Sequence, residues 1–260
     1  MSGIPEWGRQ QGWGVRLDWG RAGAAAVGPG SAVLVVVDVL SFTTAVSVLA
    51  DAGTTVLPYR WRDETAAAHA AAHGAALAVG RREVSAARPW SLSPAALRAA
   101  PFTERLVLPS PNGSAIAASV TGTPVVAASL RNAGAVADWI LAQGWGTAAR
   151  PVSIVAAGEQ WPGTDTLRPA VEDWLGAGAV AAALAAGGAG PPSPEALVAA
   201  AAHTPDADLA ALVTDSASGR ELAGNGFAAD VAVAVELGAS AAVPVLTPAG
   251  FVDHGTGTRR

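Results

Sequence analysis

The sequence predicts an α/β fold, with a three-layer α/β/α arrangement around a mostly parallel sheet and a helical C-terminal part. Apolar runs of strand length alternate with Ala-rich segments of helix length, and Gly, Pro and Asn separate them. Several of the strand candidates, 33–37 and 124–127 among them, are apolar throughout and do not alternate with polar residues. Strands of that kind are buried on both faces, which is typical of a parallel sheet covered by helices.

The predicted elements follow one another along the whole chain. Strands are predicted at 15–18, 33–37, 55–58, 76–79, 105–108, 124–127, 152–156 and 242–246. Helices are predicted at 43–51, 63–73, 113–120, 132–143, 169–186, 194–202, 206–214 and 226–237. We therefore expect a single α/β domain over residues 1–260, or two lobes joined by a linker near 188–194, where Gly and Pro are concentrated.

Composition excludes several functional classes. The chain has 260 residues, a net charge of −5 and no Cys. It also has no Lys, and all 16 of its basic residues are Arg. The missing residue types exclude disulfides, thiolate metal sites, Schiff bases and a P-loop lysine. Without a basic stripe, neither nucleic acid nor an anionic membrane is an expected partner. We recognise no secretory signal and no membrane span, so we expect a cytoplasmic protein.

One predicted strand ends on a carboxylate. In "VVVDVLSFTTA" (35–45), Asp38 closes an apolar run and is followed by Ser41, Thr43 and Thr44. Ligands of open parallel sheets bind beyond the carboxyl ends of the strands, where helix N-termini favour anions. Asp38 would suit Mg²⁺, which prefers oxygen ligands, and the hydroxyls would suit an anion. In the alternative reading, Thr43 caps the next helix and Asp38 accepts backbone N–H groups.

Polar residues recur at the other predicted strand ends. They are Asn112, Gly113 and Ser114 in "LVLPSPNGSAIA"; Ser129, Arg131 and Asn132 in "VVAASLRNAGAVADW"; Glu159 in "SIVAAGEQW"; and Arg168, Glu172 and Asp173 in "RPAVEDWLGAGA". Taken singly, an Asn-Gly turn or acidic residues in a first helical turn are ordinary structural features. Together, these residues predict a metal-assisted anion site at one edge of the sheet.

Two other motifs are weaker. His69 and His73 have the i, i+4 spacing of a zinc site, but position 70 is Ala and not the Glu of a zincin. "DVLSF" has Leu40 where haloacid dehalogenase-type phosphatases have a second Asp. The lysine that such enzymes commonly use has no counterpart in this chain. Neither motif therefore predicts the function.

The ordered motifs resemble those of the 2-phosphosulfolactate phosphatase family, which are Mg²⁺-dependent α/β enzymes. "VVVDVLSFTTAV" is similar to the family's Asp-Val-Leu-Arg-Ala-Thr-Thr motif, and "LPSPNGS" is similar to its Thr-Thr-Asn-Gly-Thr turn. "ASLRNAGAVA", "EDWLGAGA", "SGRELAGNGFAAD" and "VPVL" resemble later segments of the family. The resemblance extends from about residue 30 to residue 246, and it rests on the ordered set because no single motif is specific.

The chain also departs from the family pattern. The residues that match are Asp38, Thr43, Thr44, Asn112, Gly113, Asn132, Glu172 and Asp173. Ser41 stands where the family usually has Arg, and Gly80-Arg81-Arg82 stands where it has Gly-Glu-Arg. Of the family's Asn-Ser-Pro, only Ser93-Pro94 remains. The resemblance therefore implies that most of the phosphatase apparatus is present and that the pocket for the rest of the substrate has changed.

The implied activity is a Mg²⁺-dependent phosphatase acting on a small anionic phosphomonoester similar to 2-phosphosulfolactate. Asp38, Glu172 and Asp173 would hold Mg²⁺, directly or through waters. The substrate-binding residues implied are Thr43, Thr44, Asn112, Gly113, Ser114 and Asn132, with Arg131 and Arg220 for a second anionic group. Asp38 could instead be a covalent nucleophile, and the sequence does not separate these two roles.

Two other functions are compatible with the sequence. A non-catalytic protein that binds a phosphorylated metabolite would explain the changes at Ser41 and Arg81, although the retained carboxylates favour catalysis. A transferase that uses a phosphorylated donor is the third reading. A homodimer is expected only because homodimers are the most common assemblies.

Overall fold

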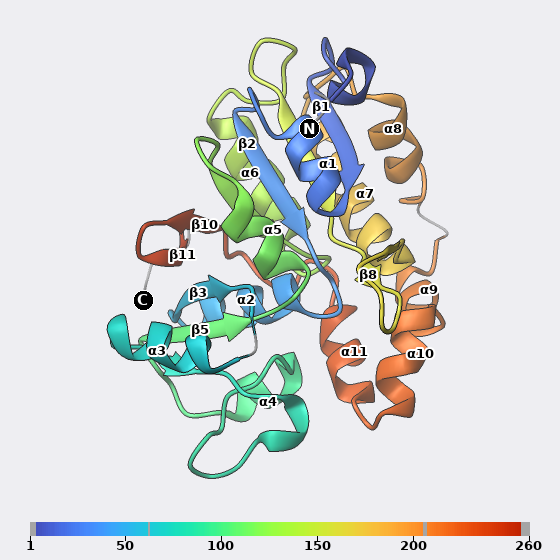
Figure 1. Cartoon of the computed structure of the whole chain (residues 1–260). Helices are drawn as coiled ribbons and strands as arrows, with labels where there is room; N and C mark the ends of the chain where they lie inside the picture. Colours follow the sequence, from blue (N-terminus) through green and yellow to red (C-terminus); the bar gives the residue numbers. More distant parts are fainter. Residues whose placement is uncertain (1–3, 62, 205–206, 256–260) are drawn as a thin grey trace.

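The computed structural model describes residues 4–61, 63–204 and 207–255, and it confirms the α/β prediction (Figure 1). The main-sheet strands are β1 (Val15–Trp19), β2 (Val33–Val37), β3 (Thr55–Tyr59), β4 (Ala76–Leu77), β5 (Arg105–Pro109), β6 (Val125–Ala128), β7 (Val152–Ala156), β10 (Pro244–Thr247) and β11 (Gly250–Asp253). A small separate hairpin consists of β8 (Glu159–Gln160) and β9 (Leu167–Arg168). Each predicted strand therefore has a counterpart in the sheet.

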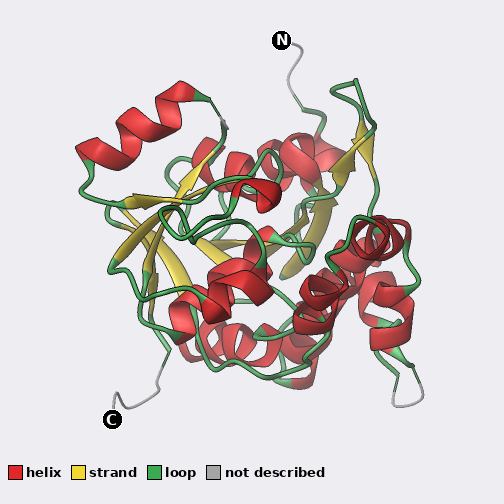
Figure 2. Ribbon diagram, turned by 90° about the horizontal axis from the view of Figure 1, so that it is seen from below, coloured by secondary structure: helices red, strands yellow, loops and turns green. Residues whose placement is uncertain are grey.

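Helices lie on both faces of the sheet (Figure 2). They are α1 (Gly20–Val27), α2 (Phe42–Asp51), α3 (Glu64–Ala72), α4 (Pro94–Ala99), α5 (Gly113–Ser119), α6 (Ala133–Ala142), α7 (Val171–Ala186), α8 (Pro194–Ala200), α9 (Leu209–Thr214), α10 (Ala217–Gly224) and α11 (Ala228–Ala234). Short 3₁₀ helices are η1 (Glu6–Arg9) and η2 (Arg81–Glu83). The sequence did not predict α1, α4 or α10. Residue 206, where a helix was expected to begin, lies outside the described residues, and α9 begins at Leu209 with Asp208 as its cap.

In the described residues, the main sheet has nine strands in the order β1-β7-β2-β6-β10-β11-β3-β5-β4. The first four strands pair in parallel, and so do the last three. The antiparallel hairpin β10–β11 joins these two parallel blocks. The prediction of a mostly parallel sheet is therefore confirmed. The sequence predicted one strand near the C-terminus, at 242–246, and not β11, which follows β10 after a two-residue turn at 248–249.

The alternation of side chains along β2 shows how the layers form. Val33, Val35 and Val37 pack in a core with α6, α7 and α8, whereas Leu34 and Val36 pack in a second core with α1, α2 and α5. All five residues are fully buried. Because β2 is covered on both faces, its carboxyl end is the natural place for a polar residue to reach a ligand.

The expected linker near 188–194 runs beside β1. The N–H of Gly14 donates to the carbonyl of Pro191 at 2.8 Å, and the N–H of Ser193 donates to the carbonyl of Val15 at 2.8 Å. This segment leads from α7 into α8. A division of the chain into two lobes at this point stays a prediction.

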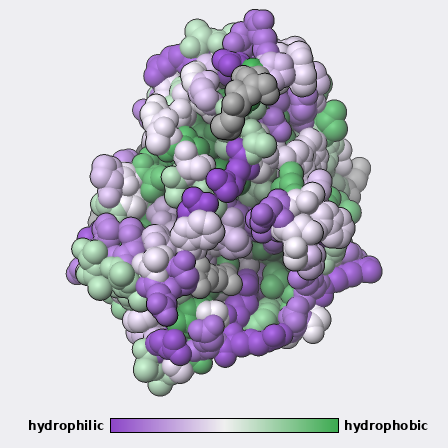
Figure 3. Space-filling view, in the orientation of Figure 1, coloured by the Kyte–Doolittle hydropathy of each residue, from purple (hydrophilic) through white to green (hydrophobic). Residues whose placement is uncertain are grey.

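The surface in Figure 3 carries hydrophobic residues scattered among hydrophilic ones, and hydrophilic residues extend along its lower edge. Among the described residues, no helix combines the length and the apolar character that crossing a bilayer requires. The longest described helix, α7, has 16 residues.

Candidate functional site

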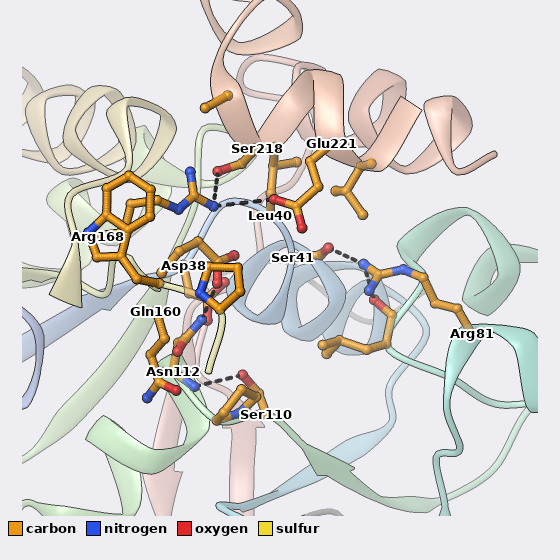
Figure 4. A pocket seen from close by; sticks show the side chains of 17 residues that line it. Asp38, Leu40, Ser41, Arg81, Ser110, Asn112, Gln160, Arg168, Ser218 and Glu221 are labelled. Atoms are coloured by element: carbon orange, nitrogen blue, oxygen red, sulfur yellow. Dashed lines mark hydrogen bonds and ion pairs between the residues drawn. The ribbon is translucent and has the colours of Figure 1, made fainter. Parts of the chain in front are cut away.

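A pocket of about 470 Å³ lies where β2, β5 and β7 end (Figure 4). Its lining comprises Asp38, Leu40, Ser41, Arg81, Leu92, Ser110, Pro111, Asn112, Glu159, Gln160, Trp161, Pro162, Arg168, Ala217, Ser218, Glu221 and Leu222. Asp38 follows β2, Asn112 follows β5 and Glu159 follows β7. The expected convergence of polar residues at the strand ends therefore occurs for these three side chains.

Asp38 is held in place by two backbone N–H groups. Its Oδ1 accepts from Phe42 at 3.0 Å, and its Oδ2 accepts from Gly113 at 2.8 Å. The side chain is buried. Burial raises the pKa of Asp38, the two N–H groups lower it, the nearby charge of Glu172 raises it, and Arg81 lowers it. The helix starts at α2 and α5 thus fix the orientation of this carboxylate.

Gly113 is required for this close approach. A Cβ at position 113 would lie 2.7 Å from Asp38 Oδ2 and 2.7 Å from Phe42 Cδ1. The Asn-Gly pair in the sequence is therefore explained by contact with Asp38 as well as by the turn it makes.

Helix α7 brings two further carboxylates to the same region. Asp173 accepts from the N–H of Val39 at 2.7 Å and from that of Gly158 at 2.8 Å. Burial raises its pKa well above the ordinary value, and the charges of Asp38 and Glu172 raise it further. Glu172 is 1% exposed, and its Oε2 has no hydrogen-bond partner. Buried carboxylate oxygens are normally paired, so this atom is the one best suited to bind a cation.

Glu159 is a fourth carboxylate of this group; the sequence placed it among the polar strand-end residues but not among the metal ligands. Its Oε2 accepts from Asn112 Nδ2 at 2.7 Å. Burial and the charge of Asp38 raise the pKa of Glu159 to about 7, with Glu172 also raising it and Arg168 lowering it. The four carboxylates therefore concentrate negative charge in this region. Asp38 and Glu159 line the pocket, and Glu172 and Asp173 are buried beside it.

Replacement of Glu159 with Gln should stabilise the metal-free protein in a pH-dependent way. The folded-state pKa of about 7 exceeds the ordinary 4.5, so ionised Glu159 opposes folding increasingly as pH rises between these values. Without metal, the melting temperature of Glu159→Gln should match wild type near about pH 4 and exceed it by several degrees near about pH 8. Calorimetry in EDTA measures this. Glu104→Gln, an exposed matched change, should show no such trend, and equal gains at both pH values would contradict the assignment.

The carboxylate oxygens of this group are the type of ligand that a magnesium ion prefers. Asp38, Glu172 and Asp173 offer only oxygen, and one buried oxygen of Glu172 has no partner. In the described part of the chain, no three His, Asp or Glu side chains form a ready-made metal cage. Mg²⁺ is usually held by one or two carboxylates together with waters and substrate phosphate, so such a cage is not required.

The hydroxyls predicted to bind the phosphoryl group are hydrogen-bonded to the main chain in this structure. Thr43 Oγ1 donates to the carbonyl of Asp38 at 2.8 Å, and Thr44 Oγ1 donates to that of Val39 at 2.7 Å. Ser114 Oγ donates to the carbonyl of Tyr59. These hydroxyls shape the loops around Asp38, because their protons are taken by the main chain, and none of them lines the pocket.

Asn132 is also a structural residue in this conformation. Its Oδ1 accepts from the N–H of Ser129 at 2.8 Å, and its Nδ2 donates to the carbonyl of Ala242 at 3.0 Å. The side chain is buried away from the pocket lining. It connects the end of β6 to the segment that leads into β10.

The two arginines expected to bind a second anionic group lie elsewhere. Arg131 is buried, and its guanidinium donates to Ser47, Asp51 and Glu236. Asp51 is the last residue of α2, whereas the pocket lies at the first turn of that helix. Because α2 has ten residues, its two ends are about 15 Å apart. Arg220 is 74% exposed and pairs with Asp215 at 3.7 Å. Neither arginine lines the pocket.

Arg131→Ala should therefore reduce stability and leave substrate binding unchanged. Removing the cation of a fully buried ion pair typically lowers the free energy of unfolding by about 3–5 kcal/mol. Asp51 and Glu236 are partly exposed, so water can solvate them and we expect a loss of about 2 kcal/mol. Urea denaturation measures the loss, and KM should stay within about twofold of wild type. A tenfold rise in KM without a loss of stability would contradict this placement.

The arginines at the pocket are Arg81 and Arg168, which Figure 4 shows on opposite sides of Asp38. Arg168 Nη2 lies 3.4 Å from Ser218 Oγ and 3.4 Å from Glu221 Oε2. Arg81 Nε lies 2.8 Å from Asp230 Oδ2. Asp230 is 149 positions from Arg81 in the sequence, so no local pattern could have shown this pair.

Comparison with known protein families identifies one match. The model of the family described as 2-phosphosulpholactate phosphatase matches residues 26–248. The matched region contains the Asp38 loop, the Asn112–Gly113 turn, the start of α7 and the Arg81–Asp230 pair. No curated protein sequence matches the chain.

Proposed function

Because the chain belongs to the 2-phosphosulpholactate phosphatase family, which by its name comprises phosphoric monoester hydrolases, we propose that it is Mg²⁺-dependent and hydrolyses a small anionic phosphomonoester similar to 2-phosphosulpholactate. One observation carries the proposal beyond the family. Buried carboxylates with an unpaired oxygen on Glu172 lie beside a pocket that has an arginine on each side. Such a site suits a cation and a phosphorylated anion bound together.

Asp38, Glu172 and Asp173 are the residues that would hold the metal. Mg²⁺, when bound, would neutralise charge on the phosphoryl oxygens and lower the pKa of an attacking water. Without a cation, burial raises the pKa of Asp38 and of Asp173, and repulsion from the neighbouring carboxylates raises both further. The oxygen of Glu172 that lacks a partner would gain one.

The chain supplies donors for the phosphoryl group at the Asp38 loop. Leu40 and Ser41 line the pocket, and no main-chain acceptor in the described residues takes up their N–H groups. Arg168 reaches the pocket from β9, and its 3.4 Å contact with the exposed Glu221 is weak enough to be exchanged for a phosphoryl oxygen. We therefore assign the phosphoryl group to the space between Asp38, the Leu40–Ser41 backbone and Arg168.

Asp38 has two roles that fit this position. It could hold the metal, or it could attack phosphorus and form an acyl phosphate. Its two backbone hydrogen bonds orient the carboxylate equally well for both. Acid quenching during turnover with a ³²P-labelled substrate distinguishes the roles, because only the nucleophile leaves label on a peptide containing Asp38.

The reaction class is tested by phosphate release from a panel of small phospho-acids, 2-phosphosulpholactate and phosphoglycolate included. We expect release in Mg²⁺, loss of release in EDTA, and recovery when Mg²⁺ is restored. Release that continues unchanged in EDTA would contradict the metal requirement. Absence of release from the whole panel, with the same anions still raising the melting temperature, would favour a binding protein.

A further inference from the structure

We propose that Arg81 and Ser41 bind a second oxyanion of the substrate, a carboxylate or a sulfonate, on the side of the pocket opposite Arg168. This inference rests on the proposed phosphatase function, because it assigns the part of the substrate that does not react. Figure 4 shows Ser41 between Asp38 and Arg81. A group bound at Arg81 would therefore lie beyond the phosphoryl position, and not on it.

Both residues have hydrogen-bond donors that the described residues do not use. Arg81 donates through Nε to Asp230 and through Nη2 to Ser41 Oγ and to the carbonyl of Leu92. No acceptor in the described part of the chain meets its Nη1, although an arginine carries five N–H donors. Ser41 Oγ accepts from Arg81, and its own proton has no acceptor among the described residues. Two donors on the pocket wall are thus available to an anion.

The guanidinium is positioned before any ligand binds. Asp230 is 1% exposed, and its Oδ1 accepts from Ser93 Oγ and from the N–H of Ala95 at 3.2 Å. Its Oδ2 holds Arg81 Nε at 2.8 Å, and the Phe227 ring lies 5.5 Å from Arg81 Cζ. Asp230 is therefore a positioning residue, and a fixed guanidinium loses less conformational entropy when it binds an anion.

The pocket has room for this arrangement. Its volume of about 470 Å³ falls within the range of about 300–1,000 Å³ in which proteins enclose whole small molecules. A phosphoryl group at Asp38 fills only a part of that space. The remainder extends past Ser41 to Arg81, and the donors there favour an anion over an apolar group.

Titration calorimetry with three non-hydrolysable probes tests the inference. Beside its phosphonate, phosphonoacetate carries a carboxylate and phosphonomethanesulfonate carries a sulfonate, whereas methylphosphonate carries neither. In Mg²⁺, wild type should bind at least one of the first two about tenfold more tightly than methylphosphonate, because only these two offer an acceptor to Arg81 and Ser41. The preferred probe identifies the oxyanion as a carboxylate or a sulfonate.

The decisive variant combines Arg81→Met with Asp230→Asn, so that no buried charge is left unpaired. We expect it to lose the tenfold preference and to change methylphosphonate affinity by less than about threefold. Arg82→Met is the matched control, since Arg82 is exposed, donates to Asn225 and does not line the pocket. It should retain the preference.

Two results would overturn the inference. One is a wild-type protein that binds all three probes equally, and the other is a double variant that weakens all three by the same factor. The phosphatase function fails separately, if the protein shows the Arg81-dependent preference but releases no phosphate from any phospho-acid of the panel. The two failures are therefore distinguishable.

Discussion

Asp38→Asn is expected to lower the rate of phosphate release by about three orders of magnitude, while the fold remains intact. Both carboxylate oxygens accept a backbone N–H group, from Phe42 and from Gly113. An asparagine amide can accept only one of them, and it removes the charge that a metal ligand or a nucleophile needs. Losses of this size are typical when a group that acts on the reacting atoms is removed.

The comparison for Asp38→Asn is steady-state kinetics on the best phospho-acid in saturating Mg²⁺, with circular dichroism to verify folding. Asp138→Asn makes the same chemical change on the exposed face of α6. It should leave turnover within about twofold of wild type. A folded Asp38→Asn protein that keeps more than a tenth of the activity would place the chemistry elsewhere.

Gly113→Ala should have the next largest effect, on both activity and stability. The added Cβ would lie 2.7 Å from Asp38 Oδ2 and 2.8 Å from Asp38 Cβ. Because such contacts are closer than atoms tolerate, Asp38 or the turn at Asn112 has to move, and the 2.8 Å bond to the Gly113 N–H is lost. We expect a loss of about 100-fold in kcat/KM and of about 1–3 kcal/mol in unfolding free energy.

Gly134→Ala is the control for this change. Gly134 lies on α6, is exposed, and has nothing within 4 Å of the added Cβ. It should be neutral or stabilising by up to about 1 kcal/mol, because Ala favours the helix. Urea denaturation and kinetics on both variants make the comparison. Full activity in Gly113→Ala would show that the approach of α5 to Asp38 is not needed.

Strand positions could be predicted well because β2, β5, β6 and β7 are continuous apolar runs bounded by turn residues. The elements that were missed had weaker signals. Helix α1 follows β1 without a polar cap and is rich in Gly and Ala, so it resembles a loop in composition. Strand β11 depends on its pairing with β3 and β10, and such pairing is set by tertiary contacts and not by the local sequence.

The site could be predicted where chain direction alone determines the position. Asp38 and Glu159 follow the neighbouring parallel strands β2 and β7, and they lie close together for that reason. Asn112 follows β5, which runs opposite to β2 in the other parallel block, so strand direction alone did not determine its approach to Asp38. Arg131 also follows a strand, but its side chain turns towards Asp51 at the far end of α2. A strand end therefore predicts where a backbone arrives and not where a long side chain points.

The two main departures from the family pattern contact each other. Arg81 Nη2 donates to Ser41 Oγ, across 40 positions of sequence. In the sequence these departures looked like independent losses. In the structure they form one wall of the pocket, which places a guanidinium beside the short side chain of Ser41.

The Mg²⁺ dependence of the Glu172→Gln variant tests the central claim most directly. If the buried carboxylates hold the metal that hydrolysis needs, the Mg²⁺ concentration for half-maximal phosphate release should rise at least about tenfold relative to wild type. Part of the lost activity should return at saturating Mg²⁺. Glu195→Gln, which changes an acidic residue in the first turn of α8, should give the wild-type curve. Superimposable Mg²⁺ curves for Glu172→Gln and wild type would contradict the account.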